Sequence, residues 1–425
     1  MIKKIYKKAH HTFFKSEFNS NVLTLMTGTI IAQAIPIAIT PILTRLYTPE
    51  DFGVLALFIA ITSILGSVAN GRYQLAVMLP KKDEDAINIA ALGLLIALVF
   101  SIVLLISILF FNKQIVDLLN NQLISFWLYF VPFVVLFIGL SQILNYLNLQ
   151  KKLYKDITKA QILKTTTMST FQIGFFFIKS GAMGLIMGNI ISHIISNYQL
   201  LKNVQQKYDL KKIKATQIKR LAKRFKNFPK FSLPASFVNS LESNSINFFS
   251  SIFFSITTLG FYYLAKNFLS IPSALVGSSI AQVFFKEASD EKKKTGKCIV
   301  TFNKTLVKLI LISLVFFGIL LFIAEDLFFL VFGENWRIAG TYSKYLIPIF
   351  AVRFVVSSLS SVDTIMEKQN YYLFFNIVLL STTLFVLFFA HSQEFTNFLK
   401  IYSSSILLIY LFYGFILKKM ANNEF

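Results

Sequence analysis

The sequence predicts an all-α polytopic membrane protein with twelve transmembrane helices in two six-helix lobes. The chain has 425 residues, of which 55% are hydrophobic and only 15% charged, and its mean hydropathy is +0.63. Apolar stretches of about 20 residues follow one another along nearly the whole chain. Lys and Arg concentrate in every second gap between those stretches. This composition and pattern are typical of membrane proteins.

The apolar stretches are expected to be helices. A helix of about 20 residues crosses roughly 30 Å of hydrocarbon at 1.5 Å per residue. The stretches are too long and too uniformly apolar for the strands of a membrane barrel. The predicted spans are 22–43, 52–79, 86–111, 123–148, 157–178, 181–201, 228–254, 258–285, 301–323, 341–365, 371–390 and 395–417.

The distribution of positive charge predicts the orientation of these spans. The gap 202–230 contains eleven Lys and Arg residues and the gap 286–297 contains five. The N-terminal tail (Lys3, Lys4, Lys7, Lys8 and Lys15) and the C-terminal Lys418 and Lys419 are also basic, whereas the intervening gaps are nearly free of Lys and Arg. Basic loops remain in the cytoplasm. We therefore expect an inner-membrane-type protein with both termini in the cytoplasm.

The longest hydrophilic stretch divides the chain near its middle. We expect an N-terminal lobe at 1–201, a basic cytoplasmic linker at 202–227 and a C-terminal lobe at 228–425. The linker's apolar spacing suits an amphipathic helix on the membrane surface, with a solvated linker as the alternative. The starts of the second and eighth spans, at Gly53 and Gly260, are weakly alike and run in the same direction, as in a parallel repeat.

Composition and motifs exclude several functions. The net charge of +22 lies in the predicted cytoplasmic gaps and not in an aromatic-interleaved basic patch, so nucleic acid is not an expected partner. The single cysteine, Cys298, permits no intramolecular disulfide. No zinc-binding, nucleotide-binding or Ser-His-Asp pattern stands in a plausible context. We expect neither enzyme activity nor a cofactor, with H⁺ or Na⁺ as candidate coupling ions.

Ionisable residues at membrane depth identify the candidate site, because a charge there is costly unless it faces a polar cavity. Four cations lie inside predicted spans: Arg72, Lys164, Lys266 and Arg353. The only comparably deep acid is Glu242. The candidate substrate-binding residues are these four cations and the nearby amides Asn70, Gln74 and Asn247.

Four deep cations cannot all be neutralised by one carboxylate. Some of them are expected to line an electropositive cavity, and such a cavity suits an anionic substrate, since the arginine fork matches phosphate oxygens. Glu242 is either a structural partner of Lys266 or Arg353, or a site that binds a coupling proton or cation. Lys159, Lys304 and Lys308 lie near cytoplasmic ends, where their amines are expected to reach the interface.

Several segments in order along the chain resemble the Wzx-type polysaccharide biosynthesis flippases of the MOP exporter superfamily. These segments are TRLYTPEDFG at 44–53, RYQLAVMLP at 72–80, KKDEDA at 81–86, FPKFSLP at 228–234, GFYYLA at 260–265 and IPSALVGSSIAQVFF at 271–285. The resemblance extends over essentially the whole chain. At Gln74 these flippases often have Glu, so the resemblance does not carry proton coupling over to this position.

The resemblance implies a V-shaped pair of lobes with a MOP/MATE-like fold. It also implies the transfer of an undecaprenyl-diphosphate-linked oligosaccharide, such as an O-antigen or capsule repeat unit, from the cytoplasmic to the outer leaflet by alternating access. A polymerase and a chain-length regulator of the same pathway are candidate partners. The alternatives are a polysaccharide polymerase or ligase, a drug or cation exporter of the same superfamily, and a scaffold without transport. The predicted outer loops are too short for a glycan active site, and the excess of deep cations opposes a cationic drug.

Overall fold

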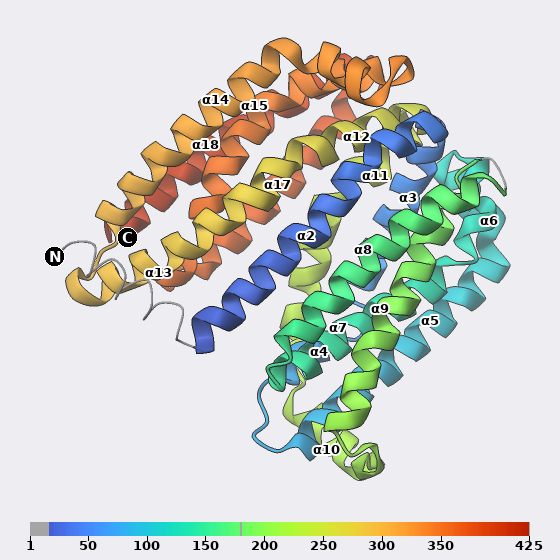
Figure 1. The fold of residues 1–425 in the computed structure, drawn as a ribbon, viewed down its shortest axis with the longest axis vertical. Coiled ribbons are helices and arrows are strands. Elements are labelled where there is room, and N and C mark those ends of the chain that lie inside the picture. The colour runs from blue at the N-terminus through green and yellow to red at the C-terminus, as the bar shows by residue number, and fades with distance from the viewer. Residues whose placement is uncertain (1–16, 179–180, 425) are drawn as a thin grey trace.

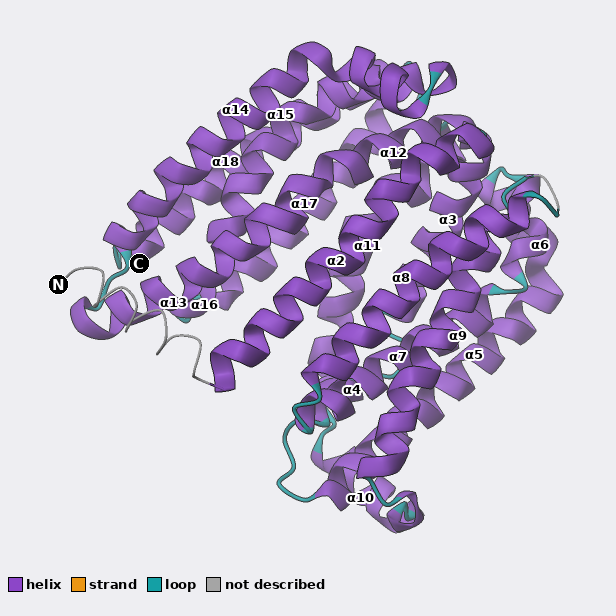
Figure 2. Ribbon diagram, in the orientation of Figure 1, coloured by secondary structure: helices purple, strands orange, loops and turns teal. Residues whose placement is uncertain are grey.

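The computed structural model describes residues 17–178 and 181–424. The described part contains helices and no strands, joined by short loops (Figure 2). The elements of the first half are α2 (Glu17–Leu46), α3 (Pro49–Gly66), α4 (Tyr73–Ala76), α5 (Asp83–Leu119), η1 (Gln122–Ile124), α6 (Ser125–Leu128), α7 (Val131–Gln150), α8 (Tyr154–Phe176), α9 (Met183–Lys207), η2 (Leu210–Lys212) and α10 (Ala215–Arg224).

The second half repeats this pattern of long helices. Its elements are η3 (Phe228–Ser232), α11 (Leu233–Phe253), α12 (Ile256–Pro272), η4 (Ser273–Gly277), α13 (Ser278–Thr295), α14 (Ile299–Phe332), η5 (Glu334–Trp336), α15 (Arg337–Leu359), α16 (Val362–Ile365), α17 (Gln369–Ala390) and α18 (Phe395–Ala421). The segments η3 and η4 are π-helical, whereas η1, η2 and η5 are 3-10 turns. The all-α polytopic prediction is therefore confirmed.

A long helix occupies each of the twelve predicted ranges, although only nine stretches of the described residues are long and apolar enough to cross a membrane by length and hydropathy. The helices outside that set are α8, α9 and α11. Each of them carries an ionisable residue among many Thr, Asn, Gln or Ser side chains. Nine candidate spans make the chain a multi-pass membrane protein, and the count of twelve stays a prediction.

The predicted span 52–79 is wrong as one continuous helix. Helix α3 ends at Gly66, and a series of turns leads to the short helix α4. Gly71 and Arg72 adopt the left-handed conformation with φ of 62° and 63°. Consecutive left-handed residues cannot continue a right-handed helix, and only glycine adopts that conformation without a steric cost.

Other predicted boundaries also differ from the structure. Helix α9 continues to Lys207, six residues beyond the predicted end at 201. Helix α13 continues to Thr295, ten residues beyond 285, because the polar residues after Phe285 stay helical until Gly296, whose φ of 74° ends the helix. The fourth long helix starts at Val131 and not at 123, since η1 and α6 precede it.

The helices form two groups that meet at one end. Figure 1 shows α2–α9 gathered in one group, the N-terminal helices, and α11–α18 in the other, the C-terminal helices. The groups meet where α3 and α12 begin, whereas α10 and α13 stand far apart at the opposite end (Figure 1). Trp336 is completely buried at the meeting end and donates from Nε1 to the carbonyl oxygen of Thr44 at 2.8 Å.

The meeting end contains a reciprocal contact between two glycines. A Cβ atom added to Gly53 in α3 would overlap the backbone oxygen of Ile256 at the start of α12. A Cβ atom added to Gly260 in α12 would overlap the backbone oxygen of Pro49 at the start of α3. In both helices the glycine lies four residues after the residue whose backbone oxygen a Cβ atom on the other helix's glycine would overlap: Gly53 follows Pro49, and Gly260 follows Ile256. The weak likeness of the two sequence segments thus coincides with equivalent positions in space.

The linker contains the predicted amphipathic helix, α10, but its apolar face is covered by protein. Leu221 is completely buried and belongs to the same cluster as Tyr73. Arg220 pairs with Asp85 and Lys212 with Glu84, both at 2.7 Å. The hydrogen bond to Glu84 raises the pKa of Lys212. The linker is therefore docked on the start of α5. It is not free in solvent, and the apolar face of α10 is not inserted in the membrane surface.

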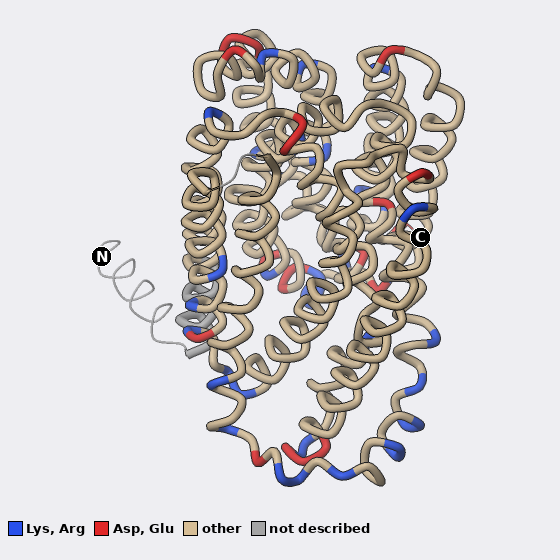
Figure 3. The backbone as a smooth tube through the Cα atoms, turned by 90° about the vertical axis from the view of Figure 1, so that its right-hand side faces the viewer, with Lys and Arg blue, Asp and Glu red and all other residues tan. Residues whose placement is uncertain are grey.

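Basic residues gather at the end at which the groups stand apart. Lys and Arg dominate the lower end of the tube in Figure 3, where α10 lies. The C-terminal residues Lys418 and Lys419 are described, whereas the basic N-terminal tail and Lys179 lie outside the described residues.

The native cysteine gives a prediction for labelling experiments. Cys298, between α13 and α14, is completely buried, and burial raises the pKa of its thiol to about 11. The reactive thiolate is then about 100-fold rarer than at the ordinary pKa. We expect no maleimide labelling of the folded protein at pH 7 and full labelling after denaturation in SDS. The matched variant Lys294→Cys, at an exposed position nearby, should label in the folded state. Rapid labelling of the native chain would contradict this.

Candidate functional site

Two of the predicted cations share one polar cluster in the C-terminal helices. Lys266 on α12 and Arg353 on α15 interact electrostatically with each other and with Glu242 on α11. Lys266 donates from Nζ to the carbonyl oxygen of Ser243 at 2.9 Å. Neither cation lies within 4.0 Å of a carboxylate oxygen among the described residues. The cluster therefore holds more positive than negative charge and no closed ion pair.

Arg353 has an exposed side chain although it lies deep in the long helix α15. Its guanidinium lies 5.9 Å from the ring centre of Phe350 and interacts with the hydroxyls of three tyrosines. These are Tyr262 on α12 and Tyr402 and Tyr410 on α18. An exposed guanidinium surrounded by hydroxyls and one carboxylate faces a polar space and not the lipid. Sequence patterns gave no signal for the three tyrosines.

Arg72 occupies a separate site at the break between α3 and α4. Asn70 is completely buried and donates from Nδ2 to Oε1 of Gln142 on α7 at 2.9 Å, while its Oδ1 accepts the backbone N–H of Arg72 at 3.2 Å. Gln74 donates to the same Gln142 oxygen at 3.3 Å. This amide network fixes the left-handed turn that carries Arg72. Nε of Arg72 and Oε1 of Gln74 are buried without a hydrogen-bond partner.

Lys164 lies in a third place, on α8 facing α9. Its charge acts on His193 of α9. The remaining candidate, Asn247, is 4% exposed on α11, and its Oδ1 has no hydrogen-bond partner. The structure thus brings Glu242, Lys266 and Arg353 together, joins Arg72 to Asn70 and Gln74, and keeps Lys164 apart from both.

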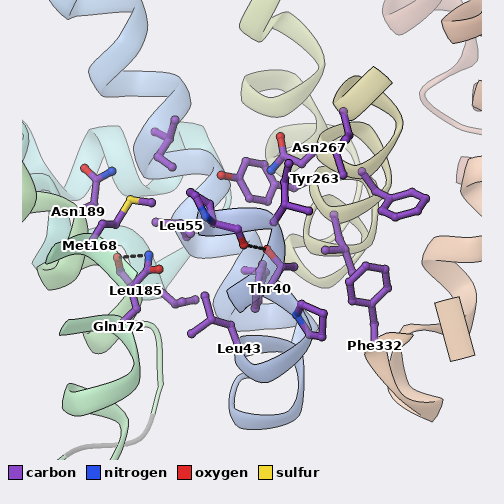
Figure 4. A pocket seen from close by; sticks show the side chains of 18 of the residues that line it. Thr40, Leu43, Leu55, Met168, Gln172, Leu185, Asn189, Tyr263, Asn267 and Phe332 are labelled. Atoms are coloured by element: carbon purple, nitrogen blue, oxygen red, sulfur yellow. Dashed lines mark hydrogen bonds between the residues drawn. The ribbon is translucent and has the colours of Figure 1, made fainter. Parts of the chain in front are cut away.

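A cavity of about 390 Å³ lies between the two groups of helices. Its walls come from α2, α3, α8 and α9 on one side and from α12 and α14 on the other. The lining is mostly apolar, and the polar side chains directed into this region in Figure 4 include Thr40, Gln172, Asn189 and Asn267. Gln172 donates to the carbonyl oxygen of Leu185 at 3.2 Å. None of the four predicted cations lines this cavity, although Lys266 lies between its lining residues Tyr263 and Asn267 in sequence.

The described part of the chain holds no cluster of three or more His, Cys, Asp or Glu side chains that could bind a metal ion. The groups around Arg353 can instead donate hydrogen bonds from cations to an anion. The guanidinium of Arg353 and the ammonium of Lys266 can neutralise phosphate or carboxylate oxygens, and the tyrosine hydroxyls can donate to or accept from hydroxyl groups.

The fold is similar to that of known membrane transporters. "Lipid II flippase MurJ, inward closed conformation" aligns with a TM-score of 0.70 at 12% identity, over 95% of this chain and 90% of that chain. An inward-facing multidrug resistance MATE family transporter of the MOP superfamily gives 0.59 at 13% identity, over 94% of each chain. A mutant of the Vibrio cholerae MATE transporter VcmN gives 0.59 at 12% identity, over 96% of each. These likenesses show that the chain has the fold of these transporters.

A comparison with curated proteins found no match. Residues 42–340 match the model of a protein family described as "Polysaccharide biosynthesis protein". The matched range includes the reciprocal glycine contact, α10, Glu242 and three of the four predicted cations, and ends before Arg353. The chain belongs to the polysaccharide biosynthesis protein family.

Proposed function

We propose that the chain is a flippase that moves an undecaprenyl-diphosphate-linked oligosaccharide from the cytoplasmic to the outer leaflet of the bacterial inner membrane. Family membership supports a role in polysaccharide biosynthesis, and the MOP fold is compatible with transport. The observation that carries the proposal is the excess of cations in the cluster around Arg353, where two cations share one carboxylate. This charge balance fits an anionic head group such as a diphosphate.

The proposed architecture has twelve spans in two lobes, with residues 1–201 and 228–425 as the lobes and 202–227 as the linker. With Lys and Arg on the cytoplasmic side, the end at which the groups stand apart faces the cytoplasm. The described conformation would then receive substrate from the inside, with the contact between α3 and α12 closing the outer side. Rocking of one lobe against the other would expose the same site to the periplasm.

The charge balance also separates this proposal from its rivals. An exporter of cationic drugs requires uncompensated acidic charge at the site, whereas the deep acid Glu242 stands beside two cations. A polymerase requires an external active site. In a deletion strain, a missing polymerase leaves unpolymerised oligosaccharide in the outer leaflet, whereas a missing flippase traps it in the inner leaflet.

The direct test uses the purified full-length chain in liposomes that contain a fluorescent undecaprenyl-diphosphate oligosaccharide. A membrane-impermeant quencher measures the fraction of lipid in the outer leaflet. We expect the protein to make the inner-leaflet lipid accessible to the quencher within minutes. Protein-free liposomes should keep about half of the lipid protected from the quencher. Undiminished protection with folded, inserted protein would refute the flippase assignment.

A further inference from the structure

His193 is a buried imidazole that the proposed transport site does not use. Its side chain is 7% exposed in the middle of α9, and Nδ1 has no hydrogen-bond partner. The ring lies close enough to Lys164 on α8 for the lysine charge to act on it. A buried polar atom without a partner is costly and invites a ligand.

Helix α2 brings a third polar group to the same depth along the helix bundle as Lys164 and His193. A Cβ atom on Gly28 would overlap Thr158, and Thr29 lies 3.5 Å from Gln161, so α2 and α8 run alongside each other in the same direction. One further turn along both helices brings Gln33 to the level of Lys164. Oε1 of Gln33 is also buried without a hydrogen-bond partner.

This level adjoins the cavity between the two groups of helices. Met168 and Asn189 line the cavity (Figure 4). Lys164 precedes Met168 by four residues on α8, and His193 follows Asn189 by four residues on the antiparallel α9. Both side chains therefore lie about one helical turn from the cavity wall, on its side away from the contact between α3 and α12.

No carboxylate neutralises this level in the described structure. Lys164 makes no ion pair among the described residues. Helix α7, which packs against both α8 and α9, contains no Asp, Glu, Lys or Arg. The other charged residues on the neighbouring elements lie toward the helix ends: Glu17 and Arg45 on α2, Glu50 and Asp51 on α3, Lys155, Asp156 and Lys159 on α8, and Lys202 and Lys207 on α9.

We propose that Gln33, Lys164 and His193 form an anion-binding subsite in the N-terminal helices, separate from the cluster around Arg353, and that His193 is protonated when an anionic group of the substrate occupies it. The subsite rests on the proposed function and specifies where a phosphate or an acidic sugar of that substrate would bind. Lys164 supplies one positive charge, and the imidazole supplies a second donor once it carries a proton.

The proposal predicts a link between binding and pH. In the empty subsite, burial and the adjacent ammonium both favour the neutral imidazole. A bound anion favours the imidazolium, so binding takes up a proton. Affinity for the anion must then fall as pH rises from the range in which the empty site loses this proton to the range in which the occupied site loses it, by up to about tenfold per pH unit.

The test measures binding of undecaprenyl phosphate and undecaprenyl diphosphate to the full-length protein in nanodiscs between pH 6.5 and 8.5, with undecaprenol as the uncharged control. For the native chain we expect affinity to fall with rising pH and a pH indicator to register proton uptake on binding. His193→Gln should remove most of this slope and the uptake. Lys164→Gln should lower affinity at least about tenfold at every pH. Lys308→Gln, at an exposed position on α14, should behave as the native chain.

The outcomes separate the two proposals. Binding of the anionic lipids with an unchanged pH slope in both His193→Gln and His193→Asn would overturn the subsite and leave the flippase assignment standing. Failure of the native chain to bind either anionic lipid would refute the flippase assignment and the subsite with it. Thermal unfolding of each variant verifies that its helices are assembled, and Gln33→Leu provides a second probe that leaves all charges in place.

Discussion

Replacement of Arg353 by Ala is expected to abolish export of surface polysaccharide while the protein remains inserted at normal abundance. The guanidinium faces a polar space bordered by Glu242 and three tyrosines and makes no closed ion pair. Its removal therefore leaves no carboxylate without a short-range ion-pair partner. The variant instead loses binding free energy for the substrate. A desolvated charge pair contributes about 2–5 kcal/mol to binding, which corresponds to at least about 30-fold in affinity.

The measurement is complementation of a deletion strain, with membrane abundance followed by immunoblot. Arg353→Lys retains the charge but loses the planar fork, so we expect intermediate export. Lys308→Ala removes an exposed cation on α14 and should complement fully. A stable Arg353→Ala protein that complements as well as the native chain would show that the guanidinium does not contact substrate.

Glu242 requires a different readout, because the sequence left it as either a structural partner or a coupling site. The structure places it in electrostatic contact with both Lys266 and Arg353. This proximity satisfies both interpretations. Glu242→Gln should lower thermal stability if the carboxylate is structural, whereas a coupling role predicts normal stability with loss of gradient-driven transport alone.

Replacement of Gly53 or Gly260 by Ala is expected to destabilise the described conformation and to reduce export. In each case the new Cβ would overlap a backbone carbonyl of the other helix, which cannot move without displacing the helix start. Overpacking of this kind costs about 1–3 kcal/mol. Because both glycines belong to one contact, the double variant should lose less stability than the sum of the two single variants.

The measurements are thermal unfolding of the purified variants and complementation of the deletion strain. Gly318→Ala is the matched control, since a Cβ atom there meets nothing within 4 Å in the middle of α14. That change should leave stability unchanged or raise it slightly, because alanine is the better helix former. Unaltered melting temperatures for both Gly53→Ala and Gly260→Ala would mean that α3 and α12 are not in close contact in the membrane.

The sequence predicted the helical class and the positions of the long helices because each span must be apolar over a fixed length. It failed at the helix break around Arg72, since the left-handed conformation of Arg72 depends on Asn70 and on Gln142 from a distant helix. The extension of α13 to Thr295 was also missed, because hydropathy marks only the apolar part of a helix and residues 286–295 are mostly polar.

The candidate site was predictable in part and for the same reason. Deep cations are conspicuous in apolar stretches, so Lys266 and Arg353 could be named from composition alone. Their assembly with Glu242 depends on how α11, α12 and α15 pack, which hydropathy does not encode. The tyrosines and His193 are compatible with an apolar span, and only their neighbours in three dimensions distinguish them.

The contact between Gly53 and Gly260 also bears on the origin of the chain. Each helix offers the other the same pair of elements, a glycine and the backbone oxygen at the helix start four residues earlier. A two-fold contact between identical subunits has this self-complementary form. A half-length ancestor could therefore have made the contact with a second copy of itself, and gene duplication would have preserved it. In the present chain both positions are glycine, so neither helix carries the side chain that would break the contact.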